Sequence, residues 1–373
     1  MAPGCATISP TGARRLLPKY NRMKEEGMGG YPRHCWYMAG WADELGEAGF
    51  SREIRGERLF VFRTAEGVAA LRDRCPHRFA PLSMGMRDGD AVVCGYHGLA
   101  FAPDGRCVRN PFAERIPAGT AVPAFCVVER DGILWLWGGD REAADEALIP
   151  DFAFVPDTPA SRTVRGYTLM QANYEYGTDN LMDLSHIEFV HKGTFAGQGV
   201  IFAGQHRVRL EGGTLHSDWW MPGIAPPSVA RGHVPDDAVV DHWLEMRWNA
   251  PASMRLMVGV CPHGAPRDTG FEVPQAHILT PANDHQTHYF WSSTRYDALD
   301  SPETDAALLT LFGEAFDRED KPMIEAAYAN VRGNLEQGGD FWTEKPLSLG
   351  IDQGGTRARR LVEAMIARER VDG

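Results

Sequence analysis

Short apolar runs separated by turn residues fill the first third of the chain. Residues 58–75, RLFVFRTAEGVAALRDRC, follow the order strand, turn, strand, and residues 99–110, LAFAPDGRCVRN, predict a hairpin around a Pro-Asp-Gly turn. The same rhythm continues to about residue 140. We therefore predict a small all-β domain over residues 31–160, which follows an N-terminal extension of little periodicity at residues 1–30.

A linker rich in proline, alanine and acidic residues leads to a second domain, expected at residues 161–373. Residues 179–193, DNLMDLSHIEFVHKG, have a helical pattern that ends at glycine, and many strand-like runs follow. Ser301 resembles a helix N-cap before Pro302 and an acidic first turn, so a long helix is predicted to begin there. The second domain is therefore expected to be α+β, an antiparallel sheet with helices packed on it, similar to a helix-grip fold.

Composition excludes several other classes of protein. A chain of 373 residues with 43% hydrophobic residues can bury a large core. Its net charge of −12 argues against a nucleic-acid surface, and it has no apolar run of the ~18–20 residues that a membrane span needs. Since its N-terminus lacks an apolar signal core, the chain is expected to be cytoplasmic. Its seven cysteines form an odd, irregular set, which favours reduced thiols or metal ligands over a disulfide framework.

Two Cys–His pairs separated by sixteen residues form the strongest motif. Cys75-Pro-His77 and Cys94-Gly-Tyr-His97 each fall on a loop between expected strands. Zinc also accepts two thiolates and two imidazoles, but structural zinc loops usually space their ligands by two to four residues. In a Rieske [2Fe-2S] centre one iron takes the two thiolates and the other takes the two imidazoles, so each loop supplies one ligand to each iron. The spacing therefore favours a Rieske cluster.

A second Cys-Pro-His sequence occurs at Cys261 to His263. No Cys-x-x-His follows it, and the histidines further along the chain come without another cysteine. We interpret Cys261 and His263 as structural residues.

Four polar groups punctuate the apolar helix candidate: Asn180, Asp183, His186 and His191. Steps of three place the first three along one helical face. His191 lies about 140° around an undistorted helix from His186, so the helix must bulge or end between them if both imidazoles are to meet one ion. Two histidines with a distant carboxylate are the facial triad of a non-haem Fe(II) oxygenase.

The carboxylate that would complete this triad is expected on the last long helix. Asp317, Glu319, Asp320 and Glu325 all qualify, and the pattern alone does not choose among them. Pro322 removes a helical hydrogen bond one turn earlier, which marks this part of the helix as unusual.

With both motifs, the chain resembles the terminal oxygenases of Rieske non-haem iron systems from Tyr31 to about Asn330. The resemblance is closest to the aromatic O-demethylase branch, of the dicamba monooxygenase and vanillate O-demethylase type, and the matching segments are CPHRFAPLS, GYHGLAF, CVRNP, DNLMDLSH, RWN, HILTP and EDK. It implies two sets of ligands: Cys75, His77, Cys94 and His97 for the [2Fe-2S] cluster, and His186, His191 and Asp320 for a mononuclear Fe(II).

The resemblance also implies roles in catalysis and assembly. Asp183 matches a carboxylate that bridges the iron centres of neighbouring subunits in a head-to-tail homotrimer, and Asn180 is a further catalytic candidate beside it. Asn249 and His277 match positions that can contact substrate. Leu311 stands where the dicamba-type enzyme has a tryptophan, which argues against an identical substrate. Six apolar residues are candidates for either a substrate pocket or the sheet core: Trp243, Met246, Trp248, Met254, Met257 and Trp291.

The activity implied is O2-dependent hydroxylation of a carbon next to an ether oxygen or amide nitrogen of a small aromatic compound, followed by release of an aldehyde. Electrons from NAD(P)H are expected through a separate reductase or ferredoxin, because the sequence contains neither a G-x-G-x-x-G fingerprint nor a plant-type ferredoxin cysteine run. Three alternatives stay open: hydroxylation of the aromatic ring, a Rieske electron carrier without oxygenase activity, and a zinc-binding interaction module.

Overall fold

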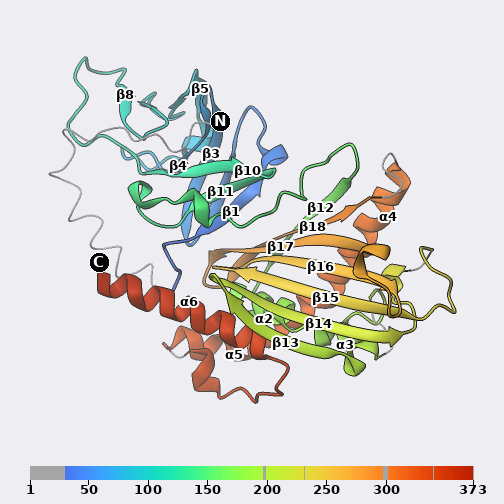
Figure 1. Cartoon of the computed structure of the whole chain (residues 1–373). Helices are drawn as coiled ribbons and strands as arrows, with labels where there is room; N and C mark the ends of the chain where they lie inside the picture. The colour runs from blue at the N-terminus through green and yellow to red at the C-terminus, as the bar shows by residue number, and fades with distance from the viewer. Residues whose placement is uncertain (1–29, 196–198, 231, 297–300, 339, 373) are drawn as a thin grey trace. The chain divides into compact units, whose positions relative to one another are not determined.

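The computed structural model describes residues 30–195, 199–230, 232–296, 301–338 and 340–372, and the chain divides into two compact units (Figure 1). The first unit runs to Ile149 and includes Ala282–Asp284 and the end of the chain from Met365. The second contains Pro150–Pro281 and His285–Ala364. The division falls after residue 149, whereas the sequence pattern suggested a boundary at 160.

Residues 151–160 fold with the second unit through buried side chains and backbone hydrogen bonds. Phe152 and Val155 are fully buried. The guanidinium of Arg165 donates to the carbonyl of Val155 at 3.1 Å, and Thr294 Oγ1 donates to the carbonyl of Phe154 at 3.2 Å. This stretch looks like a linker in composition, but it covers part of the second core.

The part of the first unit before residue 150 consists mainly of β-strands, as the sequence predicts, and contains three sheets, whereas the end of α6 (Gln353–Asp372) adds a helical segment to the unit. Their strand orders are β1-β11-β10, β2-β3-β4-β9 and β5-β6-β7-β8, with antiparallel pairing. The strands are β1 (Trp36–Trp41), β2 (Phe50–Ile54), β3 (Glu57–Thr64), β4 (Gly67–Arg72), β5 (Met86–Asp88), β6 (Ala91–Val93), β7 (Ala100–Phe101), β8 (Cys107–Arg109), β9 (Ala124–Phe125), β10 (Val127–Arg130) and β11 (Ile133–Trp137).

One apolar core in this unit supports both Cys–His loops. It gathers Phe62 from β3, Leu71 from β4 and Phe101 from β7 around Cys75 and Cys94. The first cysteine follows β4 and the second comes directly after β6. Both sulfurs are therefore anchored in packed structure, while the histidines extend outward from it.

The second unit is built on a seven-stranded antiparallel sheet with the order β12-β18-β17-β16-β15-β14-β13 (Figure 1). Period-two alternation in the central strands sends one set of side chains to each face. The strands are β12 (Arg162–Met170), β13 (Gln205–Glu211), β14 (Thr214–Ile224), β15 (Val240–Asn249), β16 (Ser253–Pro262), β17 (Phe271–Asn283) and β18 (Gln286–Arg295).

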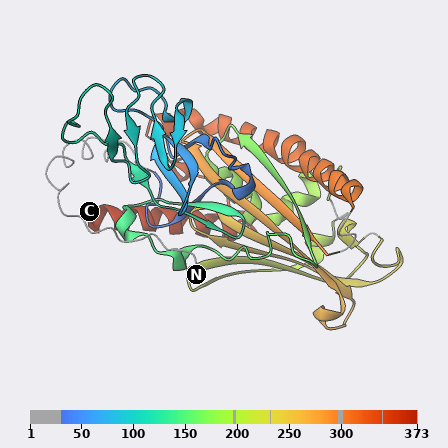
Figure 2. The same cartoon turned by 90° about the horizontal axis from the view of Figure 1, so that it is seen from above.

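Helices of the second unit gather on one face of this sheet, and α4 and α5 run beside it in orange (Figure 2). The α+β prediction is confirmed. The helices are α2 (Tyr174–Met182), α3 (Ile187–Val190), α4 (Pro302–Gly313), α5 (Lys321–Glu336) and α6 (Gln353–Asp372). None of the helices in the described part of the chain combines the length and hydrophobicity that crossing a bilayer requires.

The long helix predicted to begin at Ser301 is interrupted. Ser301 caps α4 as expected, because its side chain accepts a hydrogen bond from the amide of Thr304. A π-helical segment, Glu314–Asp320, then separates α4 from α5, and Pro322 lies in the first turn of α5. The irregularity that the proline suggested is therefore a π-helix, a form that is frequent at functional sites.

Candidate active site and metal centres

The two Cys–His loops have the same backbone conformation. The amide of Cys75 donates to the carbonyl of Ala80 at 2.8 Å, and the amide of Phe79 returns to the carbonyl of Cys75 at 2.9 Å. Cys94 makes the equivalent two bonds in its own loop, also at 2.8 and 2.9 Å. The fourth residue after each cysteine is left-handed, with φ of 64° at Phe79 and 72° at Gly98. The repeated turn presents the two sulfurs in a matching way, whereas the histidine comes two residues after the cysteine in the first loop and three residues after it in the second.

The four side chains form a donor set that fits a Rieske cluster. The rings of His77 and His97 lie 4.4 Å apart between centroids, and both cysteines are buried. Burial, together with the neighbouring thiol of Cys94, raises the pKa of Cys75 to about 11, so the thiolates need a positive partner such as iron. The Nδ1 atom of His97 is buried without a hydrogen-bond partner, as expected of a ligand atom.

The second Cys-Pro-His sequence has local partners, in agreement with a structural role. The buried thiol of Cys261 faces the carbonyl of Ala265 at 3.7 Å. His263 Nδ1 lies 2.7 Å from Asp241 Oδ1, and Asp241 also accepts backbone amides from two glycines. These contacts fix the end of β16.

The second candidate centre consists of His186, His191 and Asp320. One possible ligand atom from each lies within 4.8 Å of the others. His191 Nε2 is 3.2 Å from Asp320 Oδ2, and His186 Nε2 is 3.6 Å from Asp320 Oδ1. His186 precedes the short helix α3 and His191 ends it, so the termination of this helix allows both imidazoles to face one point.

Of the four candidate carboxylates, Asp320 is the one in this cluster. Asp317 accepts a hydrogen bond from Thr168, and Glu325 accepts one from the amide of Gln171 at 2.7 Å. Burial raises the pKa of Asp320, but its hydrogen bond from His191 and the charge of the two imidazoles outweigh burial and lower it overall. The cluster is therefore a carboxylate with two histidines, a donor set that suits Fe(II).

Glu319 is a functional candidate that the sequence interpretation did not identify as a partner of the histidine. Its Oε2 lies 2.9 Å from His191 Nδ1, and its other oxygen accepts the amide of Gly193 at 3.0 Å. Thr194 Oγ1 also donates to it, at 2.5 Å. The contact leaves His191 Nε2 to face the cluster. The acidic pair Glu319-Asp320 was the only signal in the sequence.

Asn180 and Asp183 both lie beside this cluster. Asn180 Nδ2 donates to Asp320 Oδ1 at 3.1 Å. The backbone carbonyl of Asp183, and not its carboxylate, accepts from His186 Nδ1 at 2.5 Å. The carboxylate instead caps the next turn, accepting Ser185 N at 3.0 Å and Ser185 Oγ at 2.6 Å. A side-chain contact from Asp183 to His186 is therefore not what orients this imidazole.

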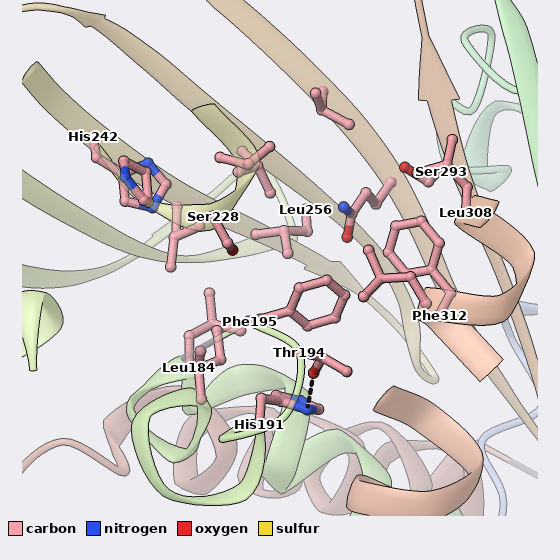
Figure 3. A pocket seen from close by; sticks show the side chains of 18 of the residues that line it. Leu184, His191, Thr194, Phe195, Ser228, His242, Leu256, Ser293, Leu308 and Phe312 are labelled. Carbon is pink, nitrogen blue, oxygen red and sulfur yellow. Dashed lines mark hydrogen bonds between the residues drawn. The ribbon is translucent and has the colours of Figure 1, made fainter. Parts of the chain in front are cut away.

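An apolar cavity of about 630 Å³ opens on the same cluster. Side chains of β15 to β18 line it from the sheet, and residues near α3 and α4 line it from the helices. Figure 3 shows His242 and Leu256 on the sheet side, with His191, Thr194 and Phe195 across from them. Its size and lining suit a small aromatic molecule.

Two of the three expected substrate contacts line this cavity. His277 reaches it from β17 and Leu311 from α4. Asn249 is not among the described lining residues, and its amide donates to Thr214 Oγ1 at 2.8 Å. The reason is strand parity: His242 and Leu244 of β15 face the cavity, and an odd spacing turns Asn249 to the opposite face. A substrate contact for Asn249 is therefore not supported.

The six apolar candidates for the pocket lie in the sheet core. They are buried or half-buried, and the described cavity lining includes none of them. Trp291, for example, packs against Phe312 and Phe316. The cavity uses smaller side chains of the same strands, such as Leu244 and Val258.

Comparison with known proteins identifies the same two parts of the chain. The Rieske [2Fe-2S] domain family matches residues 35–125, and the vanillate O-demethylase oxygenase C-terminal domain family matches residues 170–368. The chain is 34% identical to the oxygenase component of chloroacetanilide N-alkylformylase from Rhizorhabdus wittichii, covering 90% of this chain and 96% of that protein. It is 36% identical to the oxygenase component of dicamba O-demethylase from Stenotrophomonas maltophilia, covering 90% and 98%.

A crystal structure of dicamba monooxygenase with non-haem iron and dicamba has a TM-score of 0.78 and 36% identity, and the match covers 91% of this chain and 99% of that one. Fold, donor sets and matches define the class: an iron-dependent oxygenase with a Rieske domain and a separate catalytic domain. The chain belongs to the Rieske non-haem iron oxygenases, in the vanillate O-demethylase family, as the oxygenase component of a multicomponent system. Its cofactors are a [2Fe-2S] cluster and a mononuclear iron, with O2 as cosubstrate.

Proposed function

We propose that this oxygenase removes an alkyl group from an ether oxygen or amide nitrogen of a small aromatic compound. The observation that carries the proposal is the meeting of His186, His191 and Asp320 at an apolar cavity of about 630 Å³. The relatives support it, because their names describe O-demethylation and N-dealkylation. An electron carrier would need neither this cavity nor the second donor set.

Cys75, His77, Cys94 and His97 are proposed to hold the cluster, and His186, His191 and Asp320 the mononuclear iron. The iron, when bound, supplies the site at which O2 is reduced and activated toward a C–H bond. The chain itself keeps the donor atoms together and surrounds the substrate with apolar walls that exclude water. Glu319 and the carbonyl of Asp183 fix the orientation of the two imidazoles.

The reaction balances with two electrons from NAD(P)H, delivered through a separate reductase or ferredoxin. A methoxy arene, O2, NADH and a proton give the hydroxymethyl ether, water and NAD+. The hydroxymethyl ether is a hemiacetal, and it breaks its carbon–oxygen bond to release formaldehyde and a phenol. The same steps at an N-alkyl amide pass through a carbinolamine and leave the N–H amide.

A head-to-tail homotrimer is proposed to connect the two kinds of centre. The rings of Tyr96 and Phe112 lie beside His97, with centroids 4.1 and 6.4 Å away, and are 63% and 75% exposed in the single chain. A second copy of the chain would cover this surface. Asp183 Oδ2 accepts no hydrogen bond from the residues that the structure describes, which suits a bridge to His97 of the partner subunit.

A panel of methoxybenzoates, neutral methoxy arenes and N-alkyl anilides tests this function. The pure enzyme is incubated with a surrogate reductase and NADH, and released aldehyde is measured. We expect aldehyde from at least one compound class and none from Asp320→Ala. Ring-hydroxylated products without aldehyde would instead establish ring hydroxylation.

A further inference from the structure

His242 presents a hydrogen-bond acceptor to the cavity. Its Nδ1 lies 2.8 Å from the carbonyl oxygen of Gly259 on the neighbouring strand. A carbonyl can only accept, so Nδ1 carries the proton. Burial lowers the pKa of His242 to about 4, so the ring is neutral near pH 7 and Nε2 carries a lone pair. Among the described residues nothing donates to Nε2, and the ring lines the cavity (Figure 3).

A second polar group of the sheet, centred on His277, lies nearer the proposed iron ligands. Tyr289 OH lies 2.7 Å from His277 Nδ1, and His277 Nε2 lies 3.3 Å from Gln275 Oε1. Because burial lowers the pKa of His277 to about 4, the ring is neutral. The amide oxygen can only accept, so Nε2 donates to Gln275 and Nδ1 accepts from the tyrosine. Phe316, in the same π-helical segment as Asp320, packs edge-on against His277.

The two polar positions lie far apart on an apolar floor. His242 pairs with Val260 of β16, whereas Gln275 pairs with Leu256, four residues back along the same strand. Two strand spacings and four residues of rise separate His242 from Gln275 by about 16 Å. The side chains between them on the cavity face are Leu244, Leu256, Val258 and Val273. A molecule that contacts both positions must therefore be elongated and apolar in its middle.

The cavity surface near His242 would bind an anionic group poorly. The lone pair of neutral Nε2 repels a carboxylate. Arg295 also lines the cavity, but its guanidinium is occupied by Asp305 at 2.6 and 3.0 Å and by the carbonyl of Ser301 at 3.3 Å. An N–H or O–H donor would satisfy Nε2 without any rearrangement.

We propose, building on the dealkylation function, that the substrate is an elongated, uncharged aromatic whose end remote from the reacting alkyl group donates an N–H or O–H hydrogen bond to His242 Nε2. His242 is thus a specificity-determining residue that favours phenols, anilides or similar donors over benzoates. Leu244, Leu256 and Val258 hold the middle of the molecule through apolar contact.

Three biphenyl probes with one scaffold test this assignment. They are 4'-methoxybiphenyl-4-ol, which has a donor, 4,4'-dimethoxybiphenyl, which lacks one, and 4'-methoxybiphenyl-4-carboxylate, which is an anion. Binding to the holoenzyme is measured anaerobically by calorimetry, so that turnover is not required. In the wild type we expect the phenol to bind about 5- to 10-fold more tightly than the dimethoxy compound, as one buried hydrogen bond allows, and the carboxylate to bind most weakly.

Two variants separate the acceptor from the shape of the side chain. His242→Phe removes the acceptor, so the phenol and the dimethoxy probe should bind this variant about equally well. His242→Gln keeps an acceptor oxygen, so this variant should still prefer the phenol. The cluster spectrum and the melting temperature establish that each variant is folded. Equal or tighter wild-type binding of the carboxylate or dimethoxy probe would overturn the inference, as would a preference that persists in His242→Phe, or no binding of any probe.

Aldehyde release from the probes, measured separately with reductase and NADH, keeps the two proposals apart. Aldehyde release without a His242-dependent preference would leave dealkylation standing and remove the specificity assignment. A His242-dependent preference without aldehyde release from any bound methoxy probe would retain the binding site and contradict dealkylation.

Discussion

The Nδ1 atom of His191 lies 2.9 Å from Oε2 of Glu319, the residue directly before Asp320. Two consecutive acidic residues of the π-helical segment therefore contact opposite nitrogens of one imidazole, since His191 Nε2 lies 3.2 Å from Asp320 Oδ2. Glu319 also binds the loop after α3 through Gly193 and Thr194. This arrangement fixes both the tautomer and the position of the ring.

Replacing Glu319 by glutamine is predicted to weaken iron retention while leaving the Rieske cluster unchanged. Loss of a charged partner behind a metal-binding histidine typically costs roughly 10- to 100-fold in metal affinity. Fe(II) binding to the iron-depleted second site is measured by titration with a competing chelator. Asp317→Asn, on the same helical segment but bonded to Thr168, serves as the control and should bind iron normally. Equal affinities in the two variants would contradict a positioning role for Glu319.

Asp320→Ala is predicted to lower total iron from about three to about two atoms per chain, because two imidazoles alone hold Fe(II) weakly. The visible spectrum of the cluster should be unchanged, and product formation should be lost. Asp317→Ala should keep all three irons. The iron content of each variant is measured by mass spectrometry. Three irons in Asp320→Ala and two in Asp317→Ala would show that the wrong carboxylate was assigned.

Asp183→Asn is predicted to retain both centres and the trimer but to yield almost no product. The backbone carbonyl that orients His186 is unaffected by this substitution, so the iron site stays intact. The carboxylate charge that would link subunits is lost. Single-turnover reoxidation of the prereduced cluster by O2 and substrate should be greatly slowed, and reoxidation at the wild-type rate would rule out the bridging role.

His242 is predicted to make the folded chain sensitive to mild acid. Its pKa is 6.5 ordinarily and about 4 in the folded state, so between these values the unfolded state binds a proton that the folded state does not. Stability must then fall as pH falls through this window, by about 2 kcal/mol for this group between pH 7 and pH 5. Urea unfolding of the wild type and of His242→Phe at both pH values measures it. An identical pH dependence in the two proteins would show that His242 is not held neutral.

Local spacing predicted those proposed ligands that share a loop or helix. Cys75 and His77, Cys94 and His97, and His186 and His191 are each separated by only a few residues, so their chemistry is visible in the sequence. The two-unit organisation and the α+β class also followed from periodicity, because strand alternation and the capped helix at Ser301 are local properties.

Features that depend on contacts between residues far apart in the chain were harder to predict from the sequence. Selecting Asp320 over its neighbours depended on a resemblance, because the π-helical segment changes the direction in which residues 314–320 point. The position of Asn249 outside the described cavity lining was not visible in the sequence for a similar reason, since a single residue of strand parity decides which face a side chain occupies. His242 was missed because its role depends on Gly259 of the adjacent strand, and pairing between strands is not encoded in local spacing.

Oxygen isotopes test most directly whether the enzyme hydroxylates the alkyl carbon of an aromatic ether, as proposed. The enzyme, a surrogate reductase and NADH are supplied with oxygen-18 gas and a methoxy arene, and the phenol is analysed by mass spectrometry beside an assay of formaldehyde. Attack at the alkyl carbon predicts equal amounts of formaldehyde and phenol, with no heavy oxygen in the phenol. Heavy oxygen in the phenol, or phenol formed without formaldehyde, would contradict hydroxylation at the alkyl carbon.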